Sequence, residues 1–137
     1  MAESKLLQPQ AYSEPVARVR KVFVRDLEVL AYVGIYEIEK VRQQRLVISV
    51  ELDVLEDEFP HDDQLDNVVC YETVVKQIKE ICYREHVNLI ETVAERIAEQ
   101  CLLDNRVAAV RVRIEKPDVI DDCRTVGIEI ERQKNLD

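Results

Sequence analysis

The alternation of apolar and polar residues over residues 45–55, RLVISVELDVL, most constrains what this chain can fold into. In an extended chain, one face of this segment would carry Leu46, Ile48, Val50, Leu52 and Val54. A period of two is typical of a strand with one buried and one exposed face. Residues 22–33 are also β-prone, so the two segments predict a long hairpin joined by a short loop at residues 34–39.

The same alternation returns near the end of the chain. It covers residues 109–116, AVRVRIEK, and residues 125–132, TVGIEIER. Pro117 ends the first of these segments, because proline cannot donate a hydrogen bond to a sheet. Gly127 within the second segment indicates a bulge or a close approach of another backbone. Both segments are predicted strands.

Between the two pairs of strands, the hydrophobic period changes. An acidic segment with a proline, residues 56–67, predicts a loop. Apolar residues then recur at helical spacing from Tyr71 to Cys82, and again from Asn88 to Leu102. Asn88, followed three residues later by Glu91, predicts a capping box at the start of the second helix.

This order of strand, strand, helix, helix, strand, strand predicts an α+β domain. We expect a four-stranded antiparallel sheet with two helices on one face, formed by residues 19–137. Residues 1–18 contain two prolines and no apolar period, so we expect a disordered N-terminal lead-in. The long predicted strands would leave two exposed sheet edges, and such edges recruit partners unless they are blocked. The chain is therefore expected to form a homo-oligomer.

Composition narrows the class of function. The net charge is -9 and no basic face stands out, which argues against a nucleic-acid partner and favours a neutral or cationic small substrate. No apolar run is long enough to cross a membrane, and the N-terminus lacks the layout of a signal peptide, so we expect a cytoplasmic protein with four reduced cysteines. The spacing of the cysteines and of the two histidines predicts no metal site.

Lys116 is the most informative candidate on spacing alone. Its parity matches that of Val110, Val112 and Ile114, so its side chain should point to the apolar face at a strand end. Burial of an ammonium group is costly and favours its neutral form, which makes such a lysine a candidate acid or base. The alternative is a strand-end lysine whose stem packs on apolar surface while its head reaches water.

Three further residues have equally plain structural explanations. Glu91 lies in the first turn of the second helix, where it could either bind a ligand or cap backbone N–H groups. Tyr71 opens the first helix and could be a packing residue. Glu39, beside Glu37 and Lys40, could be a solvated acid of the hairpin loop. None of these signals is specific when taken alone.

Taken together and in order, five segments resemble the dihydroneopterin aldolase family. They are LAYVGIYEIE, NVVCYETV, VNLIETVAERIAE, VRVRIEKP and VGIEIER, and the resemblance runs from about Val22 to Arg132. It implies the tunnelling fold, in which the sheets of a homotetramer form a barrel and two tetramers can stack as an octamer. It also implies that the active sites lie between subunits.

The resemblance implies a role for each candidate. Glu91 matches the glutamate that anchors the pterin, helped by the backbone at Ile90, and Glu39 matches a loop glutamate that holds substrate. Tyr71 and Lys116 match the acid/base pair. The implied reaction is a retro-aldol cleavage of dihydroneopterin to glycolaldehyde and hydroxymethyl-dihydropterin, with neither cofactor, metal nor Schiff base, because the pterin ring itself accepts the electrons.

Two features depart from the family pattern, and different functions compete with the aldolase. The segment after Pro117, DVIDDC, is acidic where the family often has small residues or prolines, and the N-terminal lead-in is long.

A related epimerase of dihydroneopterin triphosphate shares the four site residues, although its substrate should require cations. A non-catalytic pterin- or purine-binding module and a purely structural oligomerising domain also compete.

Overall fold

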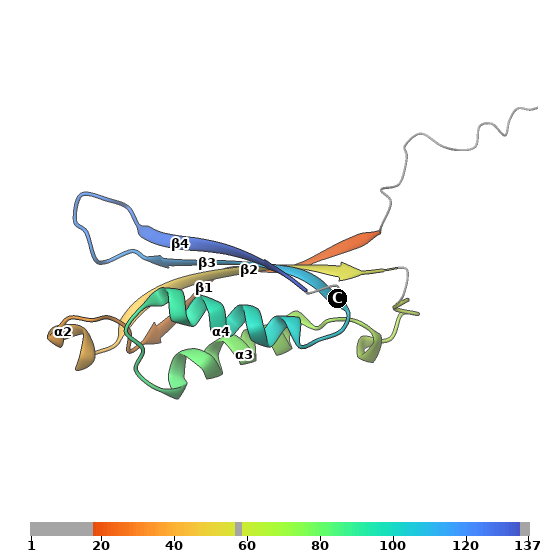
Figure 1. Cartoon of the computed structure of the whole chain (residues 1–137), viewed down its shortest axis with the longest axis horizontal. Helices are drawn as coiled ribbons and strands as arrows, with labels where there is room; N and C mark the ends of the chain where they lie inside the picture. Colours follow the sequence, from red (N-terminus) through yellow and green to blue (C-terminus); the bar gives the residue numbers. More distant parts are fainter. Residues whose placement is uncertain (1–17, 57–58, 135–137) are drawn as a thin grey trace, which may run out of the picture.

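The computed structural model describes residues 18–56 and 59–134, and Figure 1 shows their arrangement. Of the predicted N-terminal lead-in, residues 1–18, only Arg18 is among the described residues. In chain order the elements are β1 (Val19–Ala31), α2 (Glu37–Lys40), β2 (Gln44–Leu55), a short 3-10 helix (Leu65–Asn67), α3 (Tyr71–Arg84), α4 (Ile90–Leu102), β3 (Val107–Lys116) and β4 (Val126–Gln133).

The four long strands form one antiparallel sheet in the order β1-β2-β3-β4. Helices α3 and α4 lie side by side on one face of this sheet, and the other face carries no helix (Figure 1). The predicted α+β architecture is therefore confirmed. None of the described helices is long and apolar enough to cross a membrane.

The core lies between the sheet and the two long helices. The apolar face of β2 is almost completely buried, as its alternation predicted, and it contacts the inward stripes of the helices. The most deeply buried large side chains include Leu46, Ile48, Leu52, Ile78, Ile97 and Ile114. Each such side chain contributes about 1.5–3 kcal/mol when it is fully buried. The helix-free face is polar, so one face of the sheet is buried against the helices and the other is hydrophilic.

The prediction for the first hairpin was wrong at its loop end. The first strand was expected over residues 22–33, but β1 ends at Ala31 and Val33 forms a parallel bridge with Val87. The N–H of Gly34 donates to the Val87 carbonyl at 3.0 Å. These bonds turn the chain away from β2, and the predicted loop contains the short helix α2.

The predicted capping box was also wrong. Helix α4 begins at Ile90, its N-cap is Leu89, and no side chain accepts a capping hydrogen bond there. Asn88 lies before the cap, because Val87 is still held by its bridge to Val33. The Leu89 carbonyl instead accepts a hydrogen bond from the N–H of Thr92 at 3.1 Å. Glu91 is therefore not occupied as a partner in a capping box.

Gly127 marks a close approach, which was one of the two readings of this residue. A Cβ atom at this position would lie 2.1 Å from the Ile114 carbonyl oxygen. The β3–β4 register runs without interruption from Ala109 to Lys116, so no bulge is present at Gly127. The contact keeps β4 tight against β3 at the end where Lys116 lies.

Candidate active site

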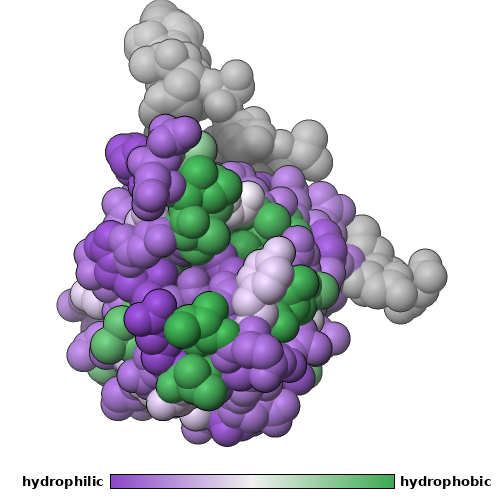
Figure 2. Space-filling model, turned by 90° about the vertical axis from the view of Figure 1, so that its left-hand side faces the viewer, coloured by the Kyte–Doolittle hydropathy of each residue, from purple (hydrophilic) through white to green (hydrophobic). Residues whose placement is uncertain are grey.

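Three elements that are distant in sequence meet at one end of the molecule. Helix α2, the start of α4 and the end of β3 all lie at the left-hand end of Figure 1. Helix α3 starts at the opposite end of the sheet (Figure 1). Apolar patches interrupt the otherwise hydrophilic surface at the left-hand end (Figure 2). At this end of the molecule, side chains from α2, from the start of α4 and from the end of β3 can therefore lie near one another at the surface.

Lys116 and Glu39 form the centre of this end. The Nζ atom of Lys116 donates to Oε2 of Glu39 at 3.4 Å, and each side chain is only 16% exposed. The orientation of Lys116 that was predicted from strand parity is confirmed. The alternative of a solvated loop acid at Glu39 is wrong, because its carboxylate is turned inward against the lysine.

Polar contacts fix the carboxylate of Glu39 in place. The backbone N–H of Tyr36 donates to Oε1 at 3.2 Å, and the amide of Gln44 donates to Oε2 at 3.1 Å. The same amide also donates to the Val33 carbonyl. Burial alone would raise the pKa of Glu39, but the bonds from Gln44 and Tyr36 and the charge of Lys116 outweigh it and lower this pKa. Glu39 is therefore a carboxylate at neutral pH.

Gly34 makes room for this carboxylate. A Cβ atom on Gly34 would lie 2.1 Å from Cδ of Glu39, and the residue has a φ of +137°. Both the space and the dihedral angle require glycine here. The position of Glu39 therefore depends on the backbone that leaves β1 as well as on its own helix.

Gln44 was missed by reasoning from sequence, although a signal was present. Its position has the same parity as Leu46 and Ile48, so a polar side chain stands on the apolar face of β2. Buried polar groups are nearly always hydrogen-bonded, and such an exception to the pattern indicates a specific partner. In the structure the partners are Glu39 and the backbone of Val33.

Glu91 is the second residue of α4, and its side chain is exposed. Its carboxylate makes no hydrogen bond or ion pair with any residue that the structure describes. Ile90, the first residue of the helix, is buried, and N–H groups of a first turn have no partner within the helix. A carboxylate at the start of a helix, next to the backbone N–H groups of Ile90 and Glu91, can bind a ligand that both donates and accepts hydrogen bonds.

Tyr71 is not brought to the other candidates within one subunit. It is the first residue of α3 and is 64% exposed, at the opposite end of the molecule (Figure 1). A 14-residue helix is about 20 Å long, and this length separates Tyr71 from the end where α4 begins. A site that uses both Tyr71 and Lys116 must therefore combine two subunits.

The acidic segment after Lys116 occupies the rim of this end. Asp118 pairs with Arg45, with 3.2 Å between Oδ1 and a terminal guanidinium nitrogen, and Arg45 also lies 3.6 Å from Glu28. The hydrogen bonds that Arg45 donates to the Asp118 carboxylate raise the pKa of Arg45 above its usual value. Arg45 is thus neutralised by two carboxylates. Among the described residues, no three His, Cys, Asp or Glu side chains are grouped so that they could hold a metal ion.

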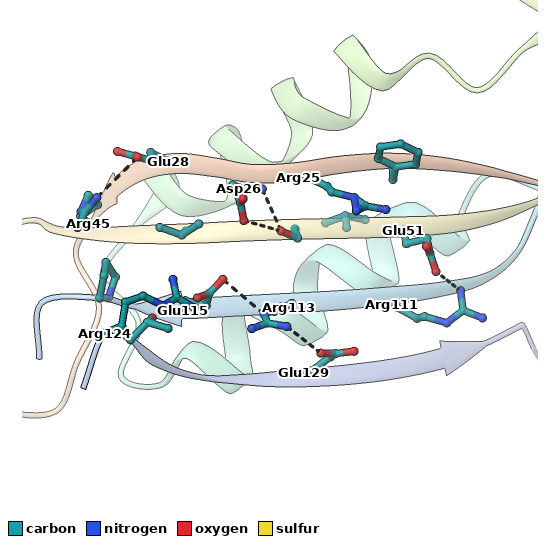
Figure 3. Close-up of a pocket in the computed structure, with 16 residues that line it drawn as sticks. Arg25, Asp26, Glu28, Arg45, Glu51, Arg111, Arg113, Glu115, Arg124 and Glu129 are labelled. Carbon is teal, nitrogen blue, oxygen red and sulfur yellow. Dashed lines mark hydrogen bonds and ion pairs between the residues drawn. The ribbon is translucent and has the colours of Figure 1, made fainter. Parts of the chain in front are cut away.

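An open groove lies on the helix-free face of the sheet and is lined by charged residues (Figure 3). Neither Lys116 nor Glu39 lines it. Charged side chains from all four strands lie along the groove, and many of them form ion pairs with one another. The groove is therefore distinct from the end that gathers the candidate residues.

Comparison with known proteins identifies the family and the fold of the chain. A family model described as FolB, dihydroneopterin aldolase, matches residues 22–131. A dihydroneopterin aldolase of Streptomyces coelicolor is 33% identical over 98 residues, which cover 72% of this chain and 82% of that protein. A dihydroneopterin aldolase structure from Burkholderia thailandensis, bound to guanine, has a TM-score of 0.75 at 35% identity and covers 85% of this chain and 93% of that chain.

A second solved structure extends the comparison to another ligand. The Escherichia coli dihydroneopterin aldolase in complex with neopterin has a TM-score of 0.76 at 26% identity. The match covers 82% of this chain and 98% of that chain. Both neighbours were therefore solved with a fused-ring heterocycle bound.

Proposed function

The chain belongs to the dihydroneopterin aldolase family, and we propose that neighbouring subunits share each of its catalytic sites. Its activity is that of a lyase, which cleaves dihydroneopterin to hydroxymethyl-dihydropterin and glycolaldehyde. The observation that carries the proposal is the inward-facing pair of Lys116 and Glu39, at the same end of the molecule as the first turn of α4 (Figure 1). The roles of individual residues follow from what each side chain can donate, accept or exchange.

Glu91 anchors the pterin in this proposal. A pterin presents an amino group and a ring N–H side by side, and one carboxylate can accept both hydrogen bonds in parallel. The carboxylate of Glu91 has no partner among the described residues, so it can bind the ligand without first breaking a bond. The neighbouring backbone at Ile90 supplies the complementary contact to the ring.

Lys116 and Tyr71 transfer the protons of the cleavage. The hydroxyl on the second side-chain carbon loses a proton, and the bond between that carbon and the first side-chain carbon breaks. The electron pair passes into the protonated imine of the ring, and a proton is then returned to the first carbon. Glu39 orients Lys116 and provides the counter-charge, so the proton transfers occur at fixed distances.

The assembly is part of the same proposal. One subunit supplies Glu39, Lys116 and Glu91, and a neighbour supplies Tyr71, which a single subunit holds at its opposite end (Figure 1). The homo-oligomer, a tetramer or octamer, is thereby required for catalysis. A cytoplasmic location also belongs to the proposal, and it agrees with four cysteines that are all free thiols.

The direct test is incubation of the purified protein with dihydroneopterin, followed by measurement of glycolaldehyde and hydroxymethyl-dihydropterin. We expect both products in equal amounts. Dihydroneopterin triphosphate is the matched second substrate, and its epimerisation without cleavage of dihydroneopterin would instead favour the epimerase. Binding of pterin with neither reaction would favour the non-catalytic module.

A further inference from the structure

The pairing of β2 with β3 stops just before the candidate site. Towards this end, the last paired residues are Val47 and Glu115, although β2 begins at Gln44 and β3 continues to Lys116. In the described sheet, the start of β2 beyond that pair is paired only with β1, and Lys116 is paired only with Val126 of β4. A gap in the backbone ladder therefore separates the two halves of the sheet at this end.

The proposed catalytic pair spans this gap. Glu39 is held by Gln44 at the start of β2, whereas Lys116 ends β3. The 3.4 Å contact between Nζ of Lys116 and Oε2 of Glu39 therefore depends on how closely the two halves are held beyond their last ladder pair. Pro117 follows at once and has no N–H with which to extend the ladder. Side chains must therefore fix the separation of the two halves here.

Arg45 and Asp118 form a second link across the gap. Nε of Arg45 donates to Oδ2 of Asp118 at 3.4 Å, and a terminal guanidinium nitrogen donates to Oδ1 at 3.2 Å. Two parallel hydrogen bonds between a planar guanidinium and a carboxylate fix orientation as well as distance. Arg45 also lies 3.6 Å from Glu28 on β1 (Figure 3). Arg45 is thus anchored to β1 and reaches the segment that follows β3.

Each end of this second link is close in sequence to the catalytic pair. Arg45 follows Gln44, whose amide binds the catalytic carboxylate. Asp118 follows Lys116 with only Pro117 between them, and the fixed φ of proline passes a shift of Asp118 to the end of β3. Successive side chains of a strand point to opposite faces, so Arg45 lies on the helix-free face and Gln44 on the helix face. The two links therefore cross the gap on opposite faces of the sheet.

We propose that Arg45 and Asp118 are positioning residues, which clamp the end of β3 to the start of β2 and so hold Lys116 within reach of Glu39 and the substrate. This inference rests on the proposed function and adds residues that act through Lys116. It gives a role to the acidic segment in which the sequence departs from the family pattern. Exposed ion pairs contribute little to stability, and Asp118 is 61% exposed, so the clamp acts on local geometry and not on the stability of the fold.

Asp118→Asn tests the clamp with little change of shape. It removes the charge that holds the bidentate pair, and a misplacement of about 1 Å can cost about 100-fold in rate. We expect single-turnover cleavage of dihydroneopterin to fall by about 10- to 100-fold, while pterin affinity and the denaturant midpoint stay unchanged. The matched control is Asp121→Asn, the same change at an exposed acid of the same segment, which should cleave at the wild-type rate.

Arg45→Lys distinguishes a clamp from simple charge balance. Lysine keeps the positive charge but cannot form the bidentate pair. We expect Arg45→Lys to slow cleavage about as much as Asp118→Asn does. The double variant should be no slower than either single variant, because both changes remove the same link. A wild-type rate in Arg45→Lys, or losses that add in the double variant, would overturn the inference.

A second measurement does not depend on turnover. Acetylation of Lys116 by acetic anhydride, followed by mass spectrometry, reports how well Glu39 and burial protect the amino group. We expect this modification to be faster in Asp118→Asn and Arg45→Lys than in the wild type, and unchanged in Asp121→Asn.

Two results for Asp118→Asn would contradict the clamp. One is a wild-type rate of both cleavage and modification. The other is a loss of pterin affinity at an unchanged cleavage rate, since Asp118 would then contact the substrate. If the wild type itself does not cleave dihydroneopterin, the proposed function fails, while the modification rates still decide whether the clamp holds Lys116.

Discussion

Lys116 and Glu39 illustrate how a common side chain acquires a specific role from its surroundings. An exposed lysine–carboxylate pair contributes little to stability, because water screens it and two long side chains lose freedom. This pair is mostly buried, and Glu39 is further held by Gln44 and by the N–H of Tyr36. The geometry of the ammonium is therefore defined before substrate binds, which is what proton transfer at a fixed distance requires.

Replacing Lys116 tests that role. We expect Lys116→Ala to keep the fold and most of the pterin affinity while single-turnover cleavage falls by about 100- to 10,000-fold, the usual contribution of positioned proton transfer. Lys116→Arg should not restore the rate, because arginine stays protonated and cannot act as a base. Lys79→Ala, at an exposed position of α3, is the control. Cleavage by Lys116→Ala at a near wild-type rate would leave a strand-end lysine without catalytic function.

Glu91 allows a clear choice between binding and capping. Glu91→Ala should reduce pterin affinity by about 10- to 150-fold, since a hydrogen bond to a charged group contributes about 1.5–3 kcal/mol. A residue that only stabilises the helix start would instead cost about 1 kcal/mol of unfolding free energy and leave affinity unchanged. Titration with a pterin and denaturant unfolding separate the two outcomes, with Glu99→Ala on the same helix as control.

The structural elements differ in how well the sequence predicts them. The strands and long helices were predictable, because residues 45–55 repeat every two positions and α3 and α4 repeat every 3.6, and burial on one face enforces both periods. Helix α2 has four residues and cannot show a helical period. The cap at Leu89 was missed because the bridge between Val87 and Val33 joins segments far apart in the chain.

In the candidate site too, local sequence patterns predicted some features, whereas contacts between distant segments could not be predicted. Strand parity predicted which way Lys116 points, but the contact with Glu39 spans 77 positions of sequence and no local pattern encodes it. The resemblance to a family identified Glu39. Gln44 could have been identified only from its polar side chain at a position on the apolar face of β2. Pairwise contacts between distant elements are thus the part that required the structure.

The loop that carries α2 depends on Gly34, and this dependence can be tested. We expect Gly34→Ala to lower the unfolding free energy by about 1–3 kcal/mol, because an L side chain is strained at this φ, and to displace the carboxylate of Glu39. Denaturant unfolding and single-turnover rates measure the two effects. If the loss of rate acts through Glu39, adding Gly34→Ala to Glu39→Ala should slow cleavage little further. Fully additive rate losses would contradict this link.

In the whole molecule, the candidate residues lie at two opposite ends of the helix layer. Helix α3 presents Tyr71 at one end, and the residues around Lys116 lie at the other (Figure 1). In the proposed site, the α3 start of one copy lies at the Lys116 end of its neighbour. Assembly would then complete the catalytic site, so assembly and activity are linked.

Complementation between inactive subunits tests this link. Tyr71→Phe and Lys116→Ala should each be slow alone, since every site lacks one proton-transfer group. When the two variants are dissociated, mixed in equal amounts and reassembled, a site with Lys116 from the first and Tyr71 from the second is intact, and random mixing gives roughly a quarter of such sites in a cyclic oligomer. We therefore expect roughly a quarter of the wild-type rate. A control mixture of Lys116→Ala with Glu91→Ala should recover nothing, because those residues come from the same subunit in the proposed site. No recovery in the first mixture would mean that Tyr71 and Lys116 do not act across a subunit boundary.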